Sequence, residues 1–266
     1  MRSASIFVIL CSVFSVSLSS ESKEPQMEEF VVPDQPSYLV VASRQRSSSS
    51  TLSRVFASHP CALHGNEIFA EDPKQDHLGA HAVVDMSQRE IYEDPHQYLT
   101  RAQEALCAQA VSDGTIPDVC NGQCTIVIKL LDIFGLPPAG IAALMEERRM
   151  EFVVLERDIE GEYCSYARAM SQGDWGTTPG QHKASLPDVP CDVVPREFTD
   201  KHEDWFAELR LQLRRSSRSF VDVPFALVAS CGLKSLAEVV FAMFGFPLPI
   251  DIDFPYDIQK LFDACL

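Results

Sequence analysis

A run of hydroxyl-bearing and basic side chains directly follows an apolar segment near the start of the chain. The apolar segment is Tyr38–Ala42, and the polar run reads Ser43-Arg44-Gln45-Arg46-Ser47-Ser48-Ser49-Ser50-Thr51. Leu52, Val55 and Phe56 follow at helical spacing, so the order is buried strand, polar loop and helix. The amino end of a helix presents unpaired N–H groups and a positive dipole, and an arginine adds bidentate donors for a tetrahedral oxyanion. The loop is therefore interpreted as an anion site, the alternative being a serine-rich helix cap with a surface arginine.

A second polar segment lies downstream, at the end of another apolar run. It reads Val153-Val154-Leu155-Glu156-Arg157-Asp158, continues through Ser165-Tyr166-Ala167-Arg168-Ala169 and reaches Gly173-Asp174-Trp175-Gly176. An arginine thus ends a strand, and a serine follows eight positions later in the next helix. Between the two segments stand Ser58-His59-Pro60 and Gly65-Asn66-Glu67-Ile68-Phe69. Together these motifs resemble the sulfotransferase family, in particular its carbohydrate and bacterial-type members, over roughly residues 37–250.

The resemblance implies a three-layer P-loop NTPase-like α/β sandwich with a central parallel β-sheet flanked by helices. It also implies a chain that binds 3′-phosphoadenylyl sulfate as co-substrate, without a metal, and transfers the sulfuryl group to a hydroxyl or amine of an acceptor. The 5′-phosphosulfate would be held by Arg46, Ser47, Ser48, Ser49 and Ser50, and the 3′-phosphate by Arg157 and Ser165. Such a transfer depends on positioning and on charge stabilisation at the leaving group, for which Arg46 is the catalytic candidate.

The acceptor hydroxyl loses a proton as it attacks sulfur, so a general base is expected beside it. By resemblance to related enzymes with a glutamate in this segment, Glu67 is the leading candidate. His64 is the second, because an imidazole with a pKa of ~6.5 suits a base at neutral pH. The alternative is that both are ordinary polar loop residues.

One departure from the family pattern lies in the loop itself. Ser48 stands where glycine is usual, and a serine that must adopt positive φ costs free energy. The alternative function is therefore a secreted, catalytically degenerate binding protein that keeps the fold. A kinase on the same fold is a weaker rival, because no Gly-Lys-Ser/Thr pair is present.

The remainder of the chain predicts alternating strands and helices. Apolar runs at 125–131 and 152–155 predict buried strands, and residues 224–229 predict another. Helices are predicted at 95–111, 138–149, 159–171, 199–218 and 233–244. Apolar strands that alternate with helices are typical of a parallel sheet covered on both faces. We expect one sulfotransferase-like domain at 37–266, after a linker at 21–36.

The N-terminus has the zones of a secretory signal peptide over residues 1–20, with Arg2 followed by an apolar run from Ile6 to Leu18. This run is short for a membrane span, which needs ~20 residues, although an uncleaved signal anchor is the alternative.

Of nine cysteines, eight lie beyond this segment, which predicts disulfides in the Golgi lumen or outside the cell. Cys120 and Cys124 alternatively form half of a zinc site.

Composition limits the partners that we expect. With 22 Lys and Arg against 38 Asp and Glu, the formal net charge is −16, which disfavours nucleic acid and anionic membranes because their phosphates are repelled. The same balance favours a neutral carbohydrate or a small hydroxylated acceptor over a polyanion. The acceptor pocket is expected within residues 64–100 and 176–200. The sequence leaves the oligomeric state open.

Overall fold

The computed structural model describes residues 36–45, 47–69, 78, 80–132, 150–172, 191, 193–216, 220–226 and 233–246. Several predicted features lie outside this part of the chain. They are the signal peptide, all but the last residue of the linker, Arg46, the helix predicted at 138–149 and the Gly173–Gly176 turn.

One sheet of five parallel strands forms the centre of the fold, in the order β2-β3-β1-β4-β5. The strands are β1 (Tyr38–Ser43), β2 (Ala62–Asn66), β3 (Thr125–Leu131), β4 (Met150–Glu156) and β5 (Phe220–Pro224). β1 pairs with both β3 and β4, and all of its residues are buried. A strand with both faces covered must be apolar throughout, which explains why its sequence does not alternate.

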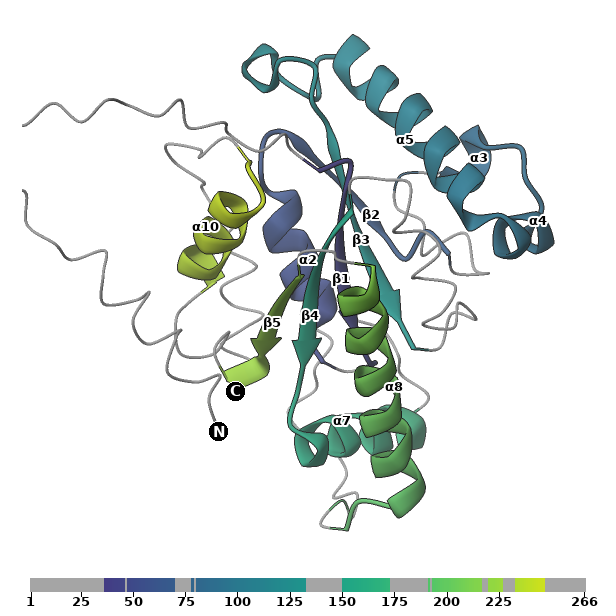
Figure 1. Cartoon of the computed structure of the whole chain (residues 1–266), viewed down its shortest axis with the longest axis vertical. Coiled ribbons are helices and arrows are strands. Elements are labelled where there is room, and N and C mark those ends of the chain that lie inside the picture. Colours follow the sequence, from purple (N-terminus) through teal and green to yellow (C-terminus); the bar gives the residue numbers. More distant parts are fainter. Residues whose placement is uncertain are drawn as a thin grey trace, which may run out of the picture. The chain divides into compact units, whose positions relative to one another are not determined.

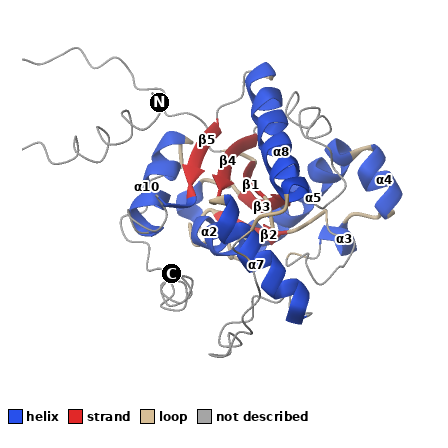
Figure 2. Ribbon diagram, turned by 90° about the horizontal axis from the view of Figure 1, so that it is seen from below, coloured by secondary structure: helices blue, strands red, loops and turns tan. Residues whose placement is uncertain are grey.

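Helices cover both faces of this sheet (Figures 1 and 2). α2 (Ser49–Ala57) and α10 (Leu233–Met243) pack on one face, where Leu39 and Val41 of β1 belong to the same apolar cluster as both helices. α5 (Pro95–Ser112) and α8 (Arg196–Arg215) pack on the other face, with Tyr38 and Val40. α7 (Ile159–Gln172) follows β4, and the shorter helices are α3 (Ala80–Val83), α4 (Gln88–Glu93) and η2 (Asp118–Cys120). The predicted three-layer α/β architecture with a parallel central sheet is confirmed.

Three elements differ from the sequence prediction. β2 was not predicted, because His64, Gly65 and Asn66 interrupt its apolar pattern. The strand predicted at 224–229 is wrong: β5 ends at Pro224, which lacks an N–H for a further ladder bond, and residues 225–226 are helical. The helix predicted at 199–218 runs instead from Arg196 to Arg215, directly after Pro195.

Among the described cysteines, three disulfides join segments that are distant in sequence. They are Cys61–Cys120, Cys107–Cys124 and Cys164–Cys191. Cys120 and Cys124 are thus oxidised in separate bridges, so neither sulfur serves as a zinc ligand. The other two cysteines beyond the signal segment, Cys231 and Cys265, lie outside the described residues. Within the described part of the chain, no helix combines the length and apolar character that a bilayer crossing requires.

Candidate functional site

Three neighbouring strands end level with one another at the carboxyl edge of the sheet. Ser43, the last residue of β1, is in register with Leu131 of β3 and Leu155 of β4. Adjacent strands lie about 4.8 Å apart, so the segments that follow these strands start close together. In open α/β sheets, ligands bind at this edge, near the point where the strand order reverses.

The serine-rich loop runs from the end of β1 into the amino end of α2. Ser48 has φ 65° and ψ 20°, which is the left-handed conformation that glycine adopts without strain, so this loop position does require positive φ. The Ser48 side chain makes no capping hydrogen bond to α2, and the first turn of this helix contains no acidic residue. Ser47 is buried and its Oγ donates to the carbonyl of Arg44 at 2.8 Å, while Ser49 is also buried.

A buried lysine from the neighbouring strand meets this helix end. Lys129 lies in β3, and its Nζ donates to Ser50 Oγ at 2.7 Å and forms an ion pair with Glu67 Oε1. Its side chain is only 5% exposed. Burial lowers the pKa of Lys129 below its ordinary value of 10.5, while the Glu67 carboxylate opposes this effect. The sequence analysis missed Lys129, although a lysine inside an otherwise apolar, fully buried strand signals a paired charge.

The two predicted base residues, His64 and Glu67, lie on either side of an irregularity at the end of β2. The pairing of β2 with β3 shifts between His64 and Asn66, and Asn66 has φ 54°. Gly65 is required here, because a Cβ atom would lie 2.9 Å from Ile126 Cγ2. Glu67 then lies buried against Lys129, whereas His64 Nε2 lies 3.2 Å from Ser53 Oγ on α2. The structure thus joins Glu67 to Ser50 through Lys129 and gives His64 a separate contact.

The predicted 3′-phosphate residues come from the strand on the other side of β1. Arg157 follows β4 directly, and its guanidinium lies 4.7 Å from the centre of the Phe225 ring. Gly161 of α7 lies close to the same turn, because a Cβ atom there would lie 2.6 Å from Asp158 Oδ1 and 3.0 Å from Arg157 Nε. Ser165 is half-buried on α7. Arg157 thus follows the strand that pairs with β1, and Ser165 lies on the helix that comes next in the chain.

A chain of alternating charges crosses the same edge from β3 to β5. Arg44 is buried, and its guanidinium pairs with Asp132 at 2.9 Å and with Glu162 of α7 at 3.3 Å. The chain continues through His202 and Arg210, and its members in order are Asp132, Arg44, Glu162, His202, Glu156, Arg210 and Asp222.

Two of these groups have strongly shifted pKa values. Burial disfavours the charged form of His202, but Glu156 and Glu162, whose carboxylates lie 3.4 Å from its two ring nitrogens, outweigh burial and raise its pKa to about 9. Conversely, His202 and then Arg210 lower the pKa of Glu156 to about 2, against the effect of its burial. His202 and Glu156 are therefore both charged at neutral pH.

Comparisons with known proteins give similarities of low identity. No protein-family model matches the chain, and no curated protein matches it significantly. Among solved structures, sulfotransferase STF1 from Mycobacterium tuberculosis H37Rv is 15% identical with a TM-score of 0.40, covering 90% of this chain and 74% of that one. The sulfotransferase domain of the Synechococcus PCC 7002 olefin synthase is 12% identical with a TM-score of 0.39, covering 91% and 84%. An unliganded sugar kinase from Janibacter sp. HTCC2649 is 11% identical with a TM-score of 0.39, covering 77% and 92%.

Ser48→Gly is expected to raise the free energy of unfolding by up to about 1 kcal/mol. Relief of left-handed strain, roughly 1–2 kcal/mol, exceeds the entropy that glycine adds to the unfolded chain, roughly 0.5–1 kcal/mol. Ser48→Val should have the opposite effect. Urea denaturation of the three proteins measures these differences, and a lower stability of the glycine variant would contradict the left-handed conformation of Ser48.

The ion pairs of His202 are expected to make stability depend on pH. Because its pKa is about 9 in the folded chain and 6.5 ordinarily, the stabilisation is complete below about pH 6.5 and is lost as pH rises through about 9. The difference in unfolding free energy between the wild type and His202→Gln should therefore shrink over this interval. Denaturation at a series of pH values tests this, and a difference that does not change with pH would argue against the ion pairs.

Proposed function

We propose that the chain is a sulfotransferase that moves the sulfuryl group of 3′-phosphoadenylyl sulfate to a hydroxyl or amine of a carbohydrate or small hydroxylated acceptor. One observation carries this proposal: the buried ammonium of Lys129 lies against Ser50, in the first turn of α2. Glu67 balances the charge of Lys129, whereas the amino end of α2 keeps its own positive dipole. A phosphosulfate bound in the serine-rich loop would be stabilised by this helix end and by the Lys129 ammonium.

Arg157 is a second basic residue near this edge of the sheet, and it favours a donor that carries a second phosphate group. Arg157 follows β4, which pairs directly with β1, and Ser165 lies on α7, the helix after β4. A nucleotide whose 5′-phosphosulfate lies on the loop would place its 3′-phosphate toward these residues. Arg46, directly before Ser47, would add a second cation at the phosphosulfate.

The cluster around Lys129 also supplies the groups that a direct transfer needs. A bond forms between the acceptor oxygen and sulfur while the bond from sulfur to the bridging phosphate oxygen breaks, and that oxygen keeps the electron pair. Lys129 and Arg46 stabilise the charge that develops on the leaving phosphate. Lys129 contacts Oε1 of Glu67, so Oε2 lies outside this ion pair and is the atom that we assign to receive the proton of the acceptor.

The catalytically degenerate alternative differs from this proposal only in turnover. Ser48 adopts the left-handed conformation although it is not glycine, which supports an anion-binding loop at this position. This favours a binding-competent loop in both cases. Donor binding and transfer must therefore be measured separately.

The wild-type protein is expected to bind 3′-phosphoadenosine 5′-phosphate. At ~100 times its dissociation constant, this ligand should stabilise the fold by ~2.7 kcal/mol, which a thermal shift assay detects. Arg46→Ala and Arg157→Ala should each lose most of this shift, because each removes a phosphate contact. Arg89→Ala is the matched control, since Arg89 is exposed and pairs with Glu93 in the same helix. Absence of a shift in the folded wild type would refute the donor site.

Glu67→Gln is expected to lower turnover by a factor of ~10² while donor binding is kept. The amide preserves an oxygen that accepts from Lys129 but no longer takes up a proton. Release of 3′-phosphoadenosine 5′-phosphate in the presence of neutral methyl glycosides measures turnover, and Glu93→Gln on the exposed face of α4 is the control. Near-normal turnover of Glu67→Gln would end its assignment as the base. Donor binding by the wild type without any transfer would support the degenerate alternative.

A further inference from the structure

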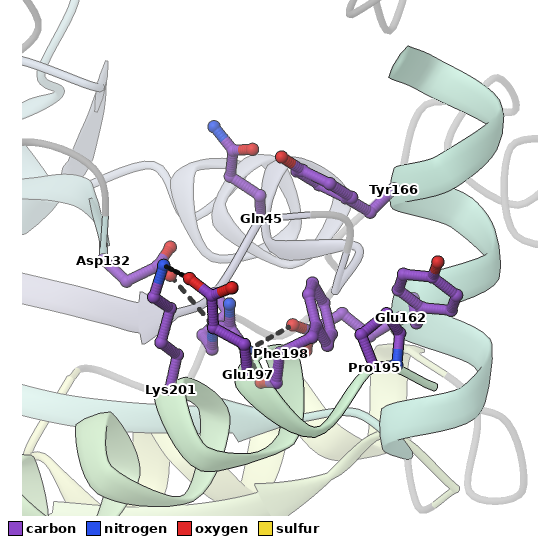
Figure 3. A pocket seen from close by; sticks show the side chains of 10 residues that line it. Gln45, Asp132, Glu162, Tyr166, Pro195, Glu197, Phe198 and Lys201 are labelled. Carbon is purple, nitrogen blue, oxygen red and sulfur yellow. Dashed lines mark hydrogen bonds and ion pairs between the residues drawn. The ribbon is translucent and has the colours of Figure 1, made fainter. Parts of the chain in front are cut away.

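A pocket of about 390 Å³ opens at the carboxyl edge of the sheet, beside α7 and the first turns of α8 (Figure 3). Arg44 and Gln45, which follow β1, and Asp132, which follows β3, contribute to its lining. Of the residues predicted to hold the donor, none that the structure describes lines it. Its volume is within the range of roughly 300–1,000 Å³ that is usual for small-molecule sites.

One wall of the pocket is a fixed salt bridge. The Arg44 guanidinium pairs with Asp132 and Glu162 and lies 4.5 Å from the centre of the Phe198 ring. Both carboxylates therefore already hold this cation in place. Asp132 uses Oδ2 for Arg44, whereas its Oδ1 is buried and has no hydrogen-bond partner among the described residues. A buried carboxylate oxygen without a partner is costly, so it favours a ligand that donates a hydrogen bond.

A second wall is aromatic. The Phe198 ring packs against Tyr163 and Tyr166 of α7, with centroid distances of 5.2 and 5.6 Å. Both tyrosines are partly exposed, and the Tyr166 ring extends from α7 toward the Gln45 side of the pocket (Figure 3). Aromatic faces next to a carboxylate and an amide suit a ring that has apolar C–H faces and hydroxyl groups around its edge.

The charges of the lining oppose an anionic occupant. Three carboxylates line the pocket against two cations. Arg44 is already paired twice, and Lys201 pairs with Glu197 at 2.9 Å. A sulfated or carboxylated ring would therefore meet no unpaired cation among the described lining residues, while a neutral polyhydroxylated ring meets no charge repulsion.

We infer that this pocket binds a neutral sugar residue of the acceptor, with the sugar ring against Tyr166 and a hydroxyl donating to Asp132 Oδ1. That this sugar is the sulfate acceptor rests on the proposed sulfotransferase function. Binding of the sugar in the pocket does not. Asp132 lies three residues after Lys129 on the same strand and its extension, so a glycan held here would lie at the edge where the donor is proposed to bind.

Saturation-transfer NMR tests the inference with the methyl β-glycosides of glucose, galactose, N-acetylglucosamine and N-acetylgalactosamine as probes. At least one should bind the wild-type chain, and methyl galactoside 6-sulfate should bind more weakly than methyl galactoside. Tyr166→Ser should weaken binding roughly three- to tenfold and leaves the ion pairs of Arg44 intact. Asp132→Asn should weaken it as well, and Tyr92→Ser, on α4 away from the pocket, is the matched aromatic control.

Binding of none of the neutral glycosides would overturn the inference, as would binding that both pocket variants retain or a preference for the sulfated sugar. The thermal shift with 3′-phosphoadenosine 5′-phosphate, measured on the same samples, separates the two proposals. If the nucleotide shift is absent but sugar binding depends on Tyr166, the sulfotransferase proposal fails and the sugar pocket stands. If the shift is present and sugar binding is absent, only the pocket inference fails.

Discussion

The packing of helices at the carboxyl edge of the sheet depends on the ion pairs of the buried Arg44 guanidinium. Arg44 follows the central strand β1, pairs with Asp132 after β3 and with Glu162 of α7, and stacks on Phe198 of α8. Removal of one partner from such a buried ion pair typically costs roughly 3–5 kcal/mol, because the other charge is left unpaired. Arg44 therefore fixes two helices relative to two strands, and His202 extends this constraint through Glu156 to β4.

The two faces of the sheet contribute different chemistry to this edge. On the face covered by α2, Lys129 joins Ser50 of the serine-rich loop to Glu67, and this is where we propose that the phosphosulfate binds. On the face covered by α8, the pocket beside Arg44 offers aromatic rings and a carboxylate oxygen. β1 and β3 supply residues to both. A donor and an acceptor held on these two sides would meet across the ends of the same strands.

Much of the sheet was predictable from sequence, because β1 and β3 are continuous apolar runs buried on both faces. The strand–loop–helix order around the serines was predictable for the same reason. Ser48 was identified as a position where glycine is usual, and its φ of 65° supplies the physical basis. Arg46 lies outside the described residues, so its role stays a prediction.

The partners of the charged residues were not predictable. Asp132 is 88 residues from Arg44 in sequence, and no local pattern links two such positions. Lys129 was not recognised as a site residue, because it stands within an apolar strand sequence. A lysine in a buried strand nevertheless requires a counter-charge. β2 was missed because a bulge and a glycine interrupt its pattern. Tertiary pairing, rather than local propensity, thus determines the details of the candidate site.

Hydrogen–deuterium exchange of the full folded chain, with and without 3′-phosphoadenosine 5′-phosphate, tests the central claim most directly. The account predicts slower exchange of the backbone amides of residues 45–52 and of 157–168 when the nucleotide is added, with little change in α5. Protection of other segments, or unchanged exchange at the serine-rich loop under saturating nucleotide, would contradict the claim that this edge of the sheet is the donor site.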